Sequence, residues 1–475
     1  MFKRTWTLSI LSVFAAALSA CAVGPDYHQP KVEVPDTQAQ SKQTAVASNW
    51  WRQFNDPVLN QLIDTGLQHN QDLIAAAARV EAAAAQAGIA RSNLRPALDA
   101  GVGAQKGRTS QQINASDTPL VSDTRYGNLS VSWELDLWGK LRRSNEAANA
   151  DFMANRFNRD AVALSLTAQL AQTYFQLRAF DAQLDIARRT LQSREESLAL
   201  QTKRFKGGII SELDQRQAEA EAASARAVIP QIARSLEQTE SALGVLLGHS
   251  PKQLVEGKLL RGQDINNLTL PLDIPAVLPS ILLERRPDIA ASEQLLIAAN
   301  ARIGAAKAAY FPSINLSGAF GSQSPSLDSL FTGPTRTWNF ASNLAAPIFN
   351  FGATGYAVDA ASANQKQALA QYQKSVQNAF KDALDAFNAN STARQIQAAQ
   401  TTQLAALNKT LHLSSLRYDN GYSNYLDVLD AQRNSFQAEL NLISAQLDRL
   451  NSTISVYKAL GGGWESDTEE VAEAR

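Results

Sequence analysis

Residues 417–433 read RYDNGYSNYLDVLDAQR, and this stretch predicts a tight turn between two long helices. The pair Asn420-Gly421 tolerates the positive φ with which a helix commonly ends. Either Ser423 or Asn424 can cap the outgoing helix, because a short polar side chain accepts hydrogen bonds from the free N–H groups of a first turn. The segment therefore predicts the tip of a helical hairpin.

A second stretch has the same design. Residues 204–214 read RFKGGIISELD, which places Gly208 after one long helical pattern and Ser211 before another. In the later turn, Asp427 and Asp430 follow the cap three residues apart, so they share one face of their helix. The chain is therefore predicted to contain two long helical hairpins with matching tips.

The helices that enter these turns are predicted to be unusually long. Between Gly139 and Phe205 there is no proline and no further glycine, and large apolar residues recur every seven positions, at Leu170, Leu177, Leu184, Leu191, Leu198 and Phe205. A helix of this length would extend ~100 Å, which exceeds a single globular core. It is expected to pack along its length as a coiled coil does.

The return helices carry two further expectations. Pro230 lies inside the first of them and should kink or break it. The second shows the clearest heptad repeat, and that repeat predicts a left-handed coiled coil whose seam includes Leu426. Its a/d pairs are Leu426/Leu429, Arg433/Phe436, Leu440/Ile443, Leu447/Leu450 and Ile454/Tyr457.

Four shorter segments alternate with a period of two, as β-strands with one apolar face do. In the clearest of them, Leu129, Val131, Trp133 and Leu135 alternate with polar residues. Each segment is about the length of a membrane-spanning strand, although a soluble hairpin on a core would alternate in the same way. The predicted strands cover about 97–106, 124–137, 312–322 and 336–347.

The second half of the chain repeats the first. Residues 72–96 match residues 288–312 at a constant offset, Gly139 matches Gly352, and Gly208 matches Gly421. The chain is therefore predicted to be an internal duplication. The expected parts are a signal peptide (1–20), a lipidated, polar, extended arm (21–57), a first repeat (58–250, hairpin 139–248), a linker (251–278), a second repeat (279–463, hairpin 352–461) and an acidic disordered tail (464–475).

The N-terminus indicates export. Lys3 and Arg4 precede a short apolar stretch, and Leu18-Ser19-Ala20-Cys21 resembles a bacterial lipobox, in which the cysteine becomes the lipidated first residue. Cys21 is the only cysteine in the chain, which favours lipidation over a plain signal peptide. We expect this lipid to hold the mature chain on the outer membrane.

Composition excludes several classes of function. The net charge of −1 argues against a nucleic-acid binder, and the four histidines lie far apart, so no metal or cofactor site is predicted. After Cys21 no stretch contains the ~20 consecutive apolar residues of a membrane helix. If the mature chain crosses a membrane, strands must do so, because only helices and closed barrels satisfy the backbone in lipid.

Four strands are too few for a membrane barrel, since barrels begin at about eight strands. An open sheet in lipid would leave two unpaired edges, so several chains would have to combine their strands. The helical hairpins support the same conclusion, because several chains could close a tube of helices that one chain leaves open. The expected fold is a mixed α/β membrane protein that forms a conduit.

The sequence resembles the outer-membrane efflux proteins, the TolC-like channels of tripartite pumps, and within them the lipidated OprM- and NodT-like branch. The resemblance rests on Cys21, on residues 278–288 and on residues 417–432, and it extends over essentially the whole mature chain. It implies a homotrimer with a twelve-stranded barrel and a helical tube. An inner-membrane RND-type transporter would feed it through a periplasmic adaptor.

The resemblance also implies roles for residues at the tips. Leu426, Asp427 and Asp430 would form the periplasmic constriction, and Tyr418 would help to latch the hairpins, with Phe205, Gly208 and Gly421 as further latch or adaptor contacts. The latch arginine of TolC-like members would fall at Ser423, so other contacts must hold this tip closed. The family role conflicts with the heptad repeat, which places Leu426 on the seam. Because helix ends often leave such a seam, we expect Leu426 to lie in the constriction as the resemblance implies.

Alternatives remain at this stage. Asp427 and Asp430 could simply be solvated acids near the positive end of a helix dipole. They could also form an acid/base pair, but no nucleophile motif accompanies them, so no enzyme is predicted. A conduit for type I protein secretion and a periplasmic coiled-coil adaptor or scaffold are the other candidate functions, although an adaptor would not need the duplicated strands.

Overall fold

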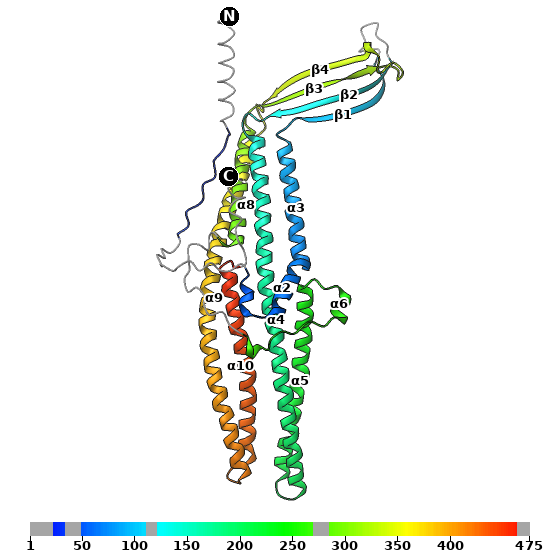
Figure 1. Cartoon of the computed structure of the whole chain (residues 1–475). Helices are drawn as coiled ribbons and strands as arrows, with labels where there is room; N and C mark the ends of the chain where they lie inside the picture. The colour runs from blue at the N-terminus through cyan, green and yellow to red at the C-terminus, as the bar shows by residue number, and fades with distance from the viewer. Residues whose placement is uncertain (1–21, 34–48, 111–120, 269–284, 463–475) are drawn as a thin grey trace. The chain divides into compact units, whose positions relative to one another are not determined.

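The computed structural model describes residues 22–33, 49–110, 121–268 and 285–462 (Figure 1). Cys21, the predicted signal peptide and the predicted acidic tail lie outside the described residues. The division of the chain into leader, arm, repeats, linker and tail therefore stays a prediction as a whole.

Two pairs of long helices dominate the described chain. Helices α4 (Lys140–Lys206) and α9 (Ala353–Asp419) have 67 residues each, and α5 (Glu212–Leu246) and α10 (Tyr425–Ala459) have 35 each. Two shorter helices also match in length, α3 (Gln71–Ser92) and α8 (Pro287–Ala308), with 22 residues each. These equal lengths confirm the internal duplication.

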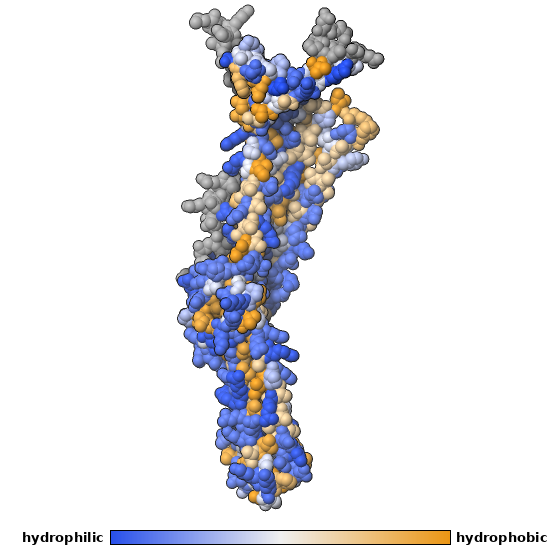
Figure 2. All heavy atoms as spheres, turned by 90° about the vertical axis from the view of Figure 1, so that its right-hand side faces the viewer, coloured by the Kyte–Doolittle hydropathy of each residue, from blue (hydrophilic) through white to orange (hydrophobic). Residues whose placement is uncertain are grey.

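The four predicted strands form one antiparallel sheet in the order β1-β2-β3-β4. Their register aligns the apolar positions, because Leu129 lies opposite Phe320 and Trp133 opposite Leu316. Large hydrophobic side chains of the strands are accordingly exposed at the molecular surface (Figure 2). The strands are β1 (Ala97–Arg108), β2 (Val121–Leu135), β3 (Ser313–Ser324) and β4 (Arg336–Ala345), within a few residues of the predicted bounds.

The sheet is open at both sides within the described residues. Strand β1 pairs only with β2, and β4 pairs only with β3. Every residue of β4 is exposed. An edge strand of this kind presents a row of unpaired backbone N–H and C=O groups, which is a template for pairing with another strand.

The chain divides into two compact units that cut across the repeats. Among the described residues, the first contains 22–32, 79–110, 121–156 and 291–373, with the sheet and the helix ends next to it. The second contains 33, 49–78, 157–268, 285–290 and 374–462, with both hairpin tips. Each unit has its own packing.

The core of the second unit includes a segment that the sequence analysis assigned to an extended polar arm. Residues Trp50–Phe54 form a 3₁₀ helix, η1, with Trp50 and Phe54 fully buried. The Trp50 ring stacks on Tyr457 with the ring centres 5.4 Å apart. The arm prediction is therefore wrong at these residues, because their aromatic side chains gain more from burial than a solvated arm would allow.

The elements around this core begin and end largely as their sequences indicate. Helix α2 (Pro57–His69) has proline as its first residue, and the side chain of the preceding residue, Asp56, caps it. Helix α5 continues through Pro230, so this proline does not break it. The linker adds a short helix, α6 (Pro251–Glu256), and a 3₁₀ turn, η2 (Ile265–Asn267); another 3₁₀ turn, η3 (Gly333–Thr335), precedes β4.

One described helix, α3, is long and apolar enough to cross a membrane by length and composition. Its hydropathy comes mainly from alanine, and Arg79 and Glu81 interrupt the apolar residues. A single such helix is weak evidence for a span. The prediction that no stretch has ~20 consecutive apolar residues holds for its sequence.

The heptad seam of α10 holds over its C-terminal half and at Leu429, and it fails at Leu426 and Arg433. Ile443, Leu450 and Tyr457 are buried, whereas Leu426 is 51% exposed and Arg433 is also exposed. Tyr425 and Val428 are buried instead, against Ala218 of α5 and Leu198 of α4. The heptad prediction for Leu426 is therefore wrong, because the first turn of the helix packs through neighbouring positions.

Candidate functional site: the hairpin tips

The turn between α9 and α10 follows from its sequence. Gly421 has φ +75°, and the N–H of Tyr422 donates to the carbonyl of Arg417 at 2.8 Å, which closes the end of α9. Asn424, and not Ser423, is the cap of α10: its side-chain oxygen accepts from the N–H of Asp427 at 3.1 Å.

The turn between α4 and α5 has the same backbone but different side-chain chemistry. Gly208 has φ +71°, and Ser211 caps α5. Asp214 completes a capping box, since its carboxylate accepts from the N–H of Ser211 at 3.2 Å. At the second tip the carboxylate of Asp427, the equivalent residue, makes no hydrogen bond or ion pair with any described residue. The two acids therefore have different roles.

The three predicted constriction residues lie on one exposed face of the second tip. Leu426, Asp427 and Asp430 are all exposed, whereas Leu429 is 1% exposed and Val428 is also buried. Asp430 accepts a hydrogen bond from the side chain of Asn434 at 3.1 Å. The packing of Val428 and Leu429 against the first hairpin thus fixes the direction in which the two carboxylates point.

Tyr418 joins the two hairpins within one chain. Its hydroxyl donates to the side-chain oxygen of Gln201 on α4 at 3.2 Å. The guanidinium of Arg204 lies 5.5 Å from the centre of the Tyr418 ring and also pairs with Asp419 at 3.8 Å. The ring of Tyr418 packs on Tyr425, whose pKa is raised by burial.

A second link lies further along the same helices. Arg433 on α10 donates through Nε to Glu221 on α5 at 2.6 Å, and this hydrogen bond raises the pKa of Arg433. Glu221 is buried, as is Arg194 of α4, whose pKa is lowered by burial. The region therefore contains two arginines around one buried carboxylate.

Sequence reasoning missed most of these partners. Arg433 occupied an a position in the heptad of α10, and a charge at an apolar position could have marked it. No comparable signal pointed to Gln201, Arg204 or Glu221, because their roles depend on which faces of two hairpins meet.

The first tip exposes apolar side chains. Ile209 and Leu213 are exposed, and Phe205 lies at the end of the α4 seam with 36% of its surface exposed. Adding a Cβ to Gly208 or Gly421 would meet no atom within 4 Å, so only backbone conformation requires glycine there. The structure places Phe205 and Gly208 at one tip and Tyr418 and Gly421 at the other.

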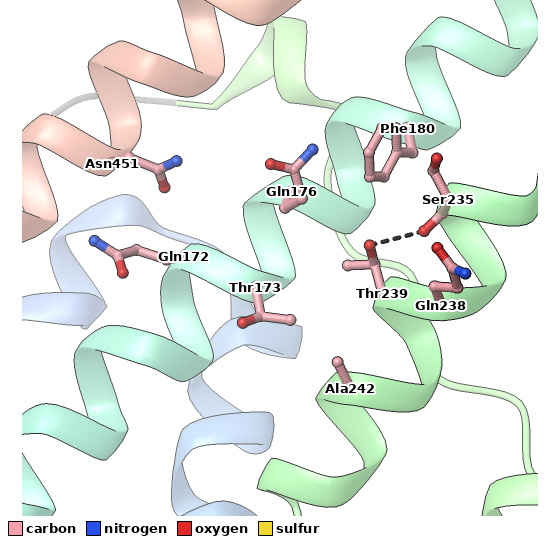
Figure 3. Close-up of a pocket in the computed structure, with 9 residues that line it drawn as sticks. All are labelled: Gln172, Thr173, Gln176, Phe180, Ser235, Gln238, Thr239, Ala242 and Asn451. Atoms are coloured by element: carbon pink, nitrogen blue, oxygen red, sulfur yellow. Dashed lines mark hydrogen bonds between the residues drawn. The ribbon is translucent and has the colours of Figure 1, made fainter. Parts of the chain in front are cut away.

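Other parts of the described chain offer little for a ligand. No group of three or more metal-binding side chains occurs among the described residues. A shallow groove of about 650 Å³ lies between α4, α5 and α10 (Figure 3). Its lining carries amides and hydroxyls but no charge, and the hydroxyl of Thr239 donates to the carbonyl of Ser235 in its own helix.

The chain combines long duplicated hairpins with an open amphipathic sheet and an acidic second tip. These features are typical of channel proteins in which several chains together enclose one passage. The profile of the family described as outer membrane efflux protein matches residues 62–249 and 278–462. A toluene efflux pump outer membrane protein, TtgC of Pseudomonas putida, is 37% identical, covering 98% of this chain and 97% of the relative.

Two further proteins agree. The cation efflux system protein CusC of Escherichia coli is 36% identical, covering 95% of this chain and 97% of the relative. The crystal structure of the CmeC outer membrane channel of Campylobacter jejuni superposes with a TM-score of 0.89 at 28% identity, covering 96% of this chain and 98% of that one. The chain belongs to the outer membrane efflux protein family. It is an outer-membrane channel of a Gram-negative efflux pump and extends into the periplasm.

Proposed function

We propose that three copies of this chain close one duct and that Leu426, Asp427 and Asp430 form its constriction at the periplasmic end. The observation that carries the constriction is the exposed face of the second tip, where two carboxylates lie beside an exposed leucine. Packing of Val428 and Leu429 holds that face in a fixed direction.

Assembly from several copies is supported by the open sheet. In the part of the chain that the structure describes, β1 and β4 each leave one side unpaired, and lipid contains no water to satisfy those backbone groups. Pairing β4 of one copy with β1 of the next removes every edge. Three copies would supply twelve strands, which lies within the range of known membrane barrels.

The constriction would act through charge. Three copies of Asp427 and Asp430 would bring six carboxylates to a narrow passage, where they repel one another and attract cations. Because the carboxylate of Asp427 has no partner among the described residues, its charge remains available to the passage.

TolC-like members have a latch arginine at the position that Ser423 occupies here. In this chain other contacts would hold the closed tip. The Tyr418–Gln201 hydrogen bond, the Arg204–Asp419 pair and the Arg433–Glu221 pair all join the two hairpins. Of these, the Arg433–Glu221 pair should be the strongest, since the buried carboxylate is poorly screened by solvent. An adaptor that separates the hairpins would have to break it.

The partners follow from the family. A periplasmic adaptor and an inner-membrane RND-type transporter would supply the cargo, and lipid on Cys21 would anchor the chain. The relatives named for toluene and for a cation match this chain about equally well. We therefore infer that the duct is passive, catalyses nothing, and conducts whatever small molecules, such as drugs, its transporter delivers.

Planar bilayer recording tests the constriction and the latch. Replacing both Asp427 and Asp430 by alanine should raise single-channel conductance severalfold and reduce the preference for cations, because repulsion and charge leave the passage. Glu221→Gln should increase the fraction of time spent open without changing ion preference. Asp448→Ala, an exposed acid far along the same helix, is the control and should change neither. If the double variant conducts as the unaltered chain does, Asp427 and Asp430 do not form the constriction.

A further inference from the structure

All four basic residues of the described strands lie at one end of the sheet. Helices α3, α4, α8 and α9 adjoin the other end, so the basic residues lie where loops join one strand to the next (Figure 1). Because the helices extend into the periplasm, this loop end of the sheet faces the outside of the cell. The four residues are Lys106 and Arg108 of β1, Arg125 of β2 and Arg336 of β4.

The basic residues also share one face of the sheet. Alternate residues of a strand point to opposite faces, and residues paired across neighbouring strands point to the same face. In β1, Lys106 and Arg108 continue the alternate positions that begin with Leu98. Arg125 of β2 pairs with Ala104, a member of the same row. These three cations therefore lie on the apolar face of the sheet.

The fourth basic residue follows the same rule. Arg336 lies two residues before Trp338, and Trp338 pairs with Phe320 in the apolar row of β3. Two acids of the strands, Asp99 and Glu134, occupy the other face and lie near the helices. The basic residues are thus separated from these acids both in face and in position along the strands.

Each strand carries an apolar row of the same length between the helices and the loop end. A row has four alternate positions and spans ~20 Å at ~3.3 Å per residue. This length is close to the apolar band of about 25 Å that outer-membrane barrels present to lipid. The rows run from Leu98 to Ala104, from Leu129 to Leu135, from Ile314 to Phe320 and from Trp338 to Leu344, with Ser342 as a polar member of the last.

The cations begin where the apolar rows end. Lys106 is the next residue of its row after Ala104, and Arg336 is the residue of its row before Trp338. Trp338 is 78% exposed, and a tryptophan at this level is typical of the border between lipid tails and headgroups. Charge on the lipid-facing side is costly in the middle of the tails and costs little at the headgroups. The basic residues therefore lie at the headgroup level of the outer leaflet.

Most of this positive charge is not neutralised by the described part of the chain. Arg125 is the exception, because it pairs with Asp123 at 3.3 Å and also lies near Asp328 of the β3–β4 loop. Asp123 is the one acid on the apolar face of the four described strands. The other three basic residues are exposed and form no ion pair with a described residue. They are free to bind an anion from the membrane.

We propose that this loop end of the sheet binds the phosphate groups of the glycolipid in the outer leaflet, the lipid A part of lipopolysaccharide, through Lys106, Arg108 and Arg336. The planar fork of an arginine matches two oxygens of a phosphate, and a lysine adds a point charge. The acyl chains of the same glycolipid would cover the apolar rows. The inference rests on strands that span the outer membrane and does not depend on the constriction at the tips.

Native mass spectrometry of the purified protein in mild detergent, with lipid A added, tests the proposed site. Lys106→Gln with Arg108→Gln should weaken binding about tenfold or more, because two charges leave the headgroup level. Lys106→Arg with Arg108→Lys keeps both charges and should retain most of the affinity. The matched control, Arg91→Gln with Arg95→Gln, removes two exposed arginines beside the opposite end of β1 and should leave the affinity unchanged. Equal losses in the first variant and the control would overturn the proposed site.

Three further probes identify the ligand. Lipid A from which the phosphates have been removed should bind about tenfold or more weakly, and phosphatidylglycerol should also bind less tightly than intact lipid A. Excess inorganic phosphate should not displace lipid A, because it lacks the acyl chains. Equal binding of either comparison lipid, or full displacement by phosphate, overturns the assignment to the glycolipid.

The state of the channel separates this inference from the proposed function. The Lys106→Gln, Arg108→Gln variant should keep the oligomer and the single-channel conductance of the unaltered chain while it loses affinity for lipid A. If that variant does not assemble, Arg336→Gln on a different strand provides the same measurement. Unchanged affinity for lipid A in an assembled Arg336→Gln channel would show that Arg336 takes no part and would overturn the proposed set of residues.

Discussion

At the scale of single residues, Asp56 holds three segments of the second unit together. It is fully buried, caps α2 through the N–H of Val58 at 2.9 Å, and accepts from the hydroxyl of Tyr174 at 2.6 Å and the N–H of Gln263 at 3.2 Å. Burial, together with the hydrogen bond to Asp56, raises the pKa of Tyr174. The linker, α2 and α4 thus meet at one carboxylate.

Removing that carboxylate should be costly. Asp56→Ala loses a helix cap, worth about 1 kcal/mol, and leaves the donors of Tyr174 and Gln263 without an acceptor, which adds about 1–3 kcal/mol for each. Tyr174→Phe removes only one donor and should cost about 1 kcal/mol. Thermal unfolding of the purified protein in detergent, followed by circular dichroism, compares the two. A midpoint for Asp56→Ala no lower than that of Tyr174→Phe would contradict this role.

At the scale of elements, helix packing changes along the hairpins. The seam of α4 is fully buried at Leu170 and Leu177 and becomes exposed at Phe205. At the same end α10 packs through Tyr425 and Val428 together with the heptad residue Leu429, whereas Leu426 is exposed. The tips therefore rely on specific hydrogen bonds and ion pairs more than on a continuous apolar seam, which suits a part that must open.

Two glycines at opposite ends of the second hairpin make a matched comparison. Gly421 and Gly461 have φ +75° and +73°, but a Cβ on Gly421 would meet nothing, whereas one on Gly461 would lie 2.4 Å from the carbonyl oxygen of Arg285. Asparagine tolerates this backbone region, so Gly421→Asn should be nearly neutral, while Gly421→Val should cost about 1–2 kcal/mol. Gly461→Asn should destabilise far more, because the clash remains. Hydrogen exchange in α10 measures all three, and equal effects of the two asparagine variants would refute the distinction.

At the scale of the whole molecule, the sheet cannot be stable in lipid as a single chain presents it. Its two edges, as described, carry unpaired backbone groups, and each such group would cost several kcal/mol in lipid. The exposed apolar residues of β4 and of the β4–α9 connection, among them Trp338 and Phe351, likewise need lipid or another copy to cover them.

The assembled protein should therefore be a trimer that resists detergent. Extracted from membranes in mild detergent, it should migrate on a gel at about three times the mass of one chain, and heating should convert it to the monomer. Sedimentation velocity in detergent provides the independent mass. A chain that is monomeric and remains soluble without detergent would exclude the channel.

Much of this architecture could be predicted from the sequence because its signals are local or repetitive. The long glycine-free and proline-free runs predicted α4 and α9, the alternation predicted four strands, and the repeated Gly208 and Gly421 predicted matching turns. The buried Trp50 and Phe54 were missed, since a short aromatic segment between polar stretches has no period that indicates burial.

The sequence by itself determined the duplication, the helical hairpins, the amphipathic strands and the two acids at the second tip, because each follows from spacing along one chain. Only the tertiary structure decided that Tyr425 and Val428 pack in the first turn of α10, that Asp214 is used in a capping box while Asp427 is not, and that Glu221 meets Arg433. Those outcomes depend on which faces of separate helices pack together, and that choice is made by contacts between residues hundreds of positions apart.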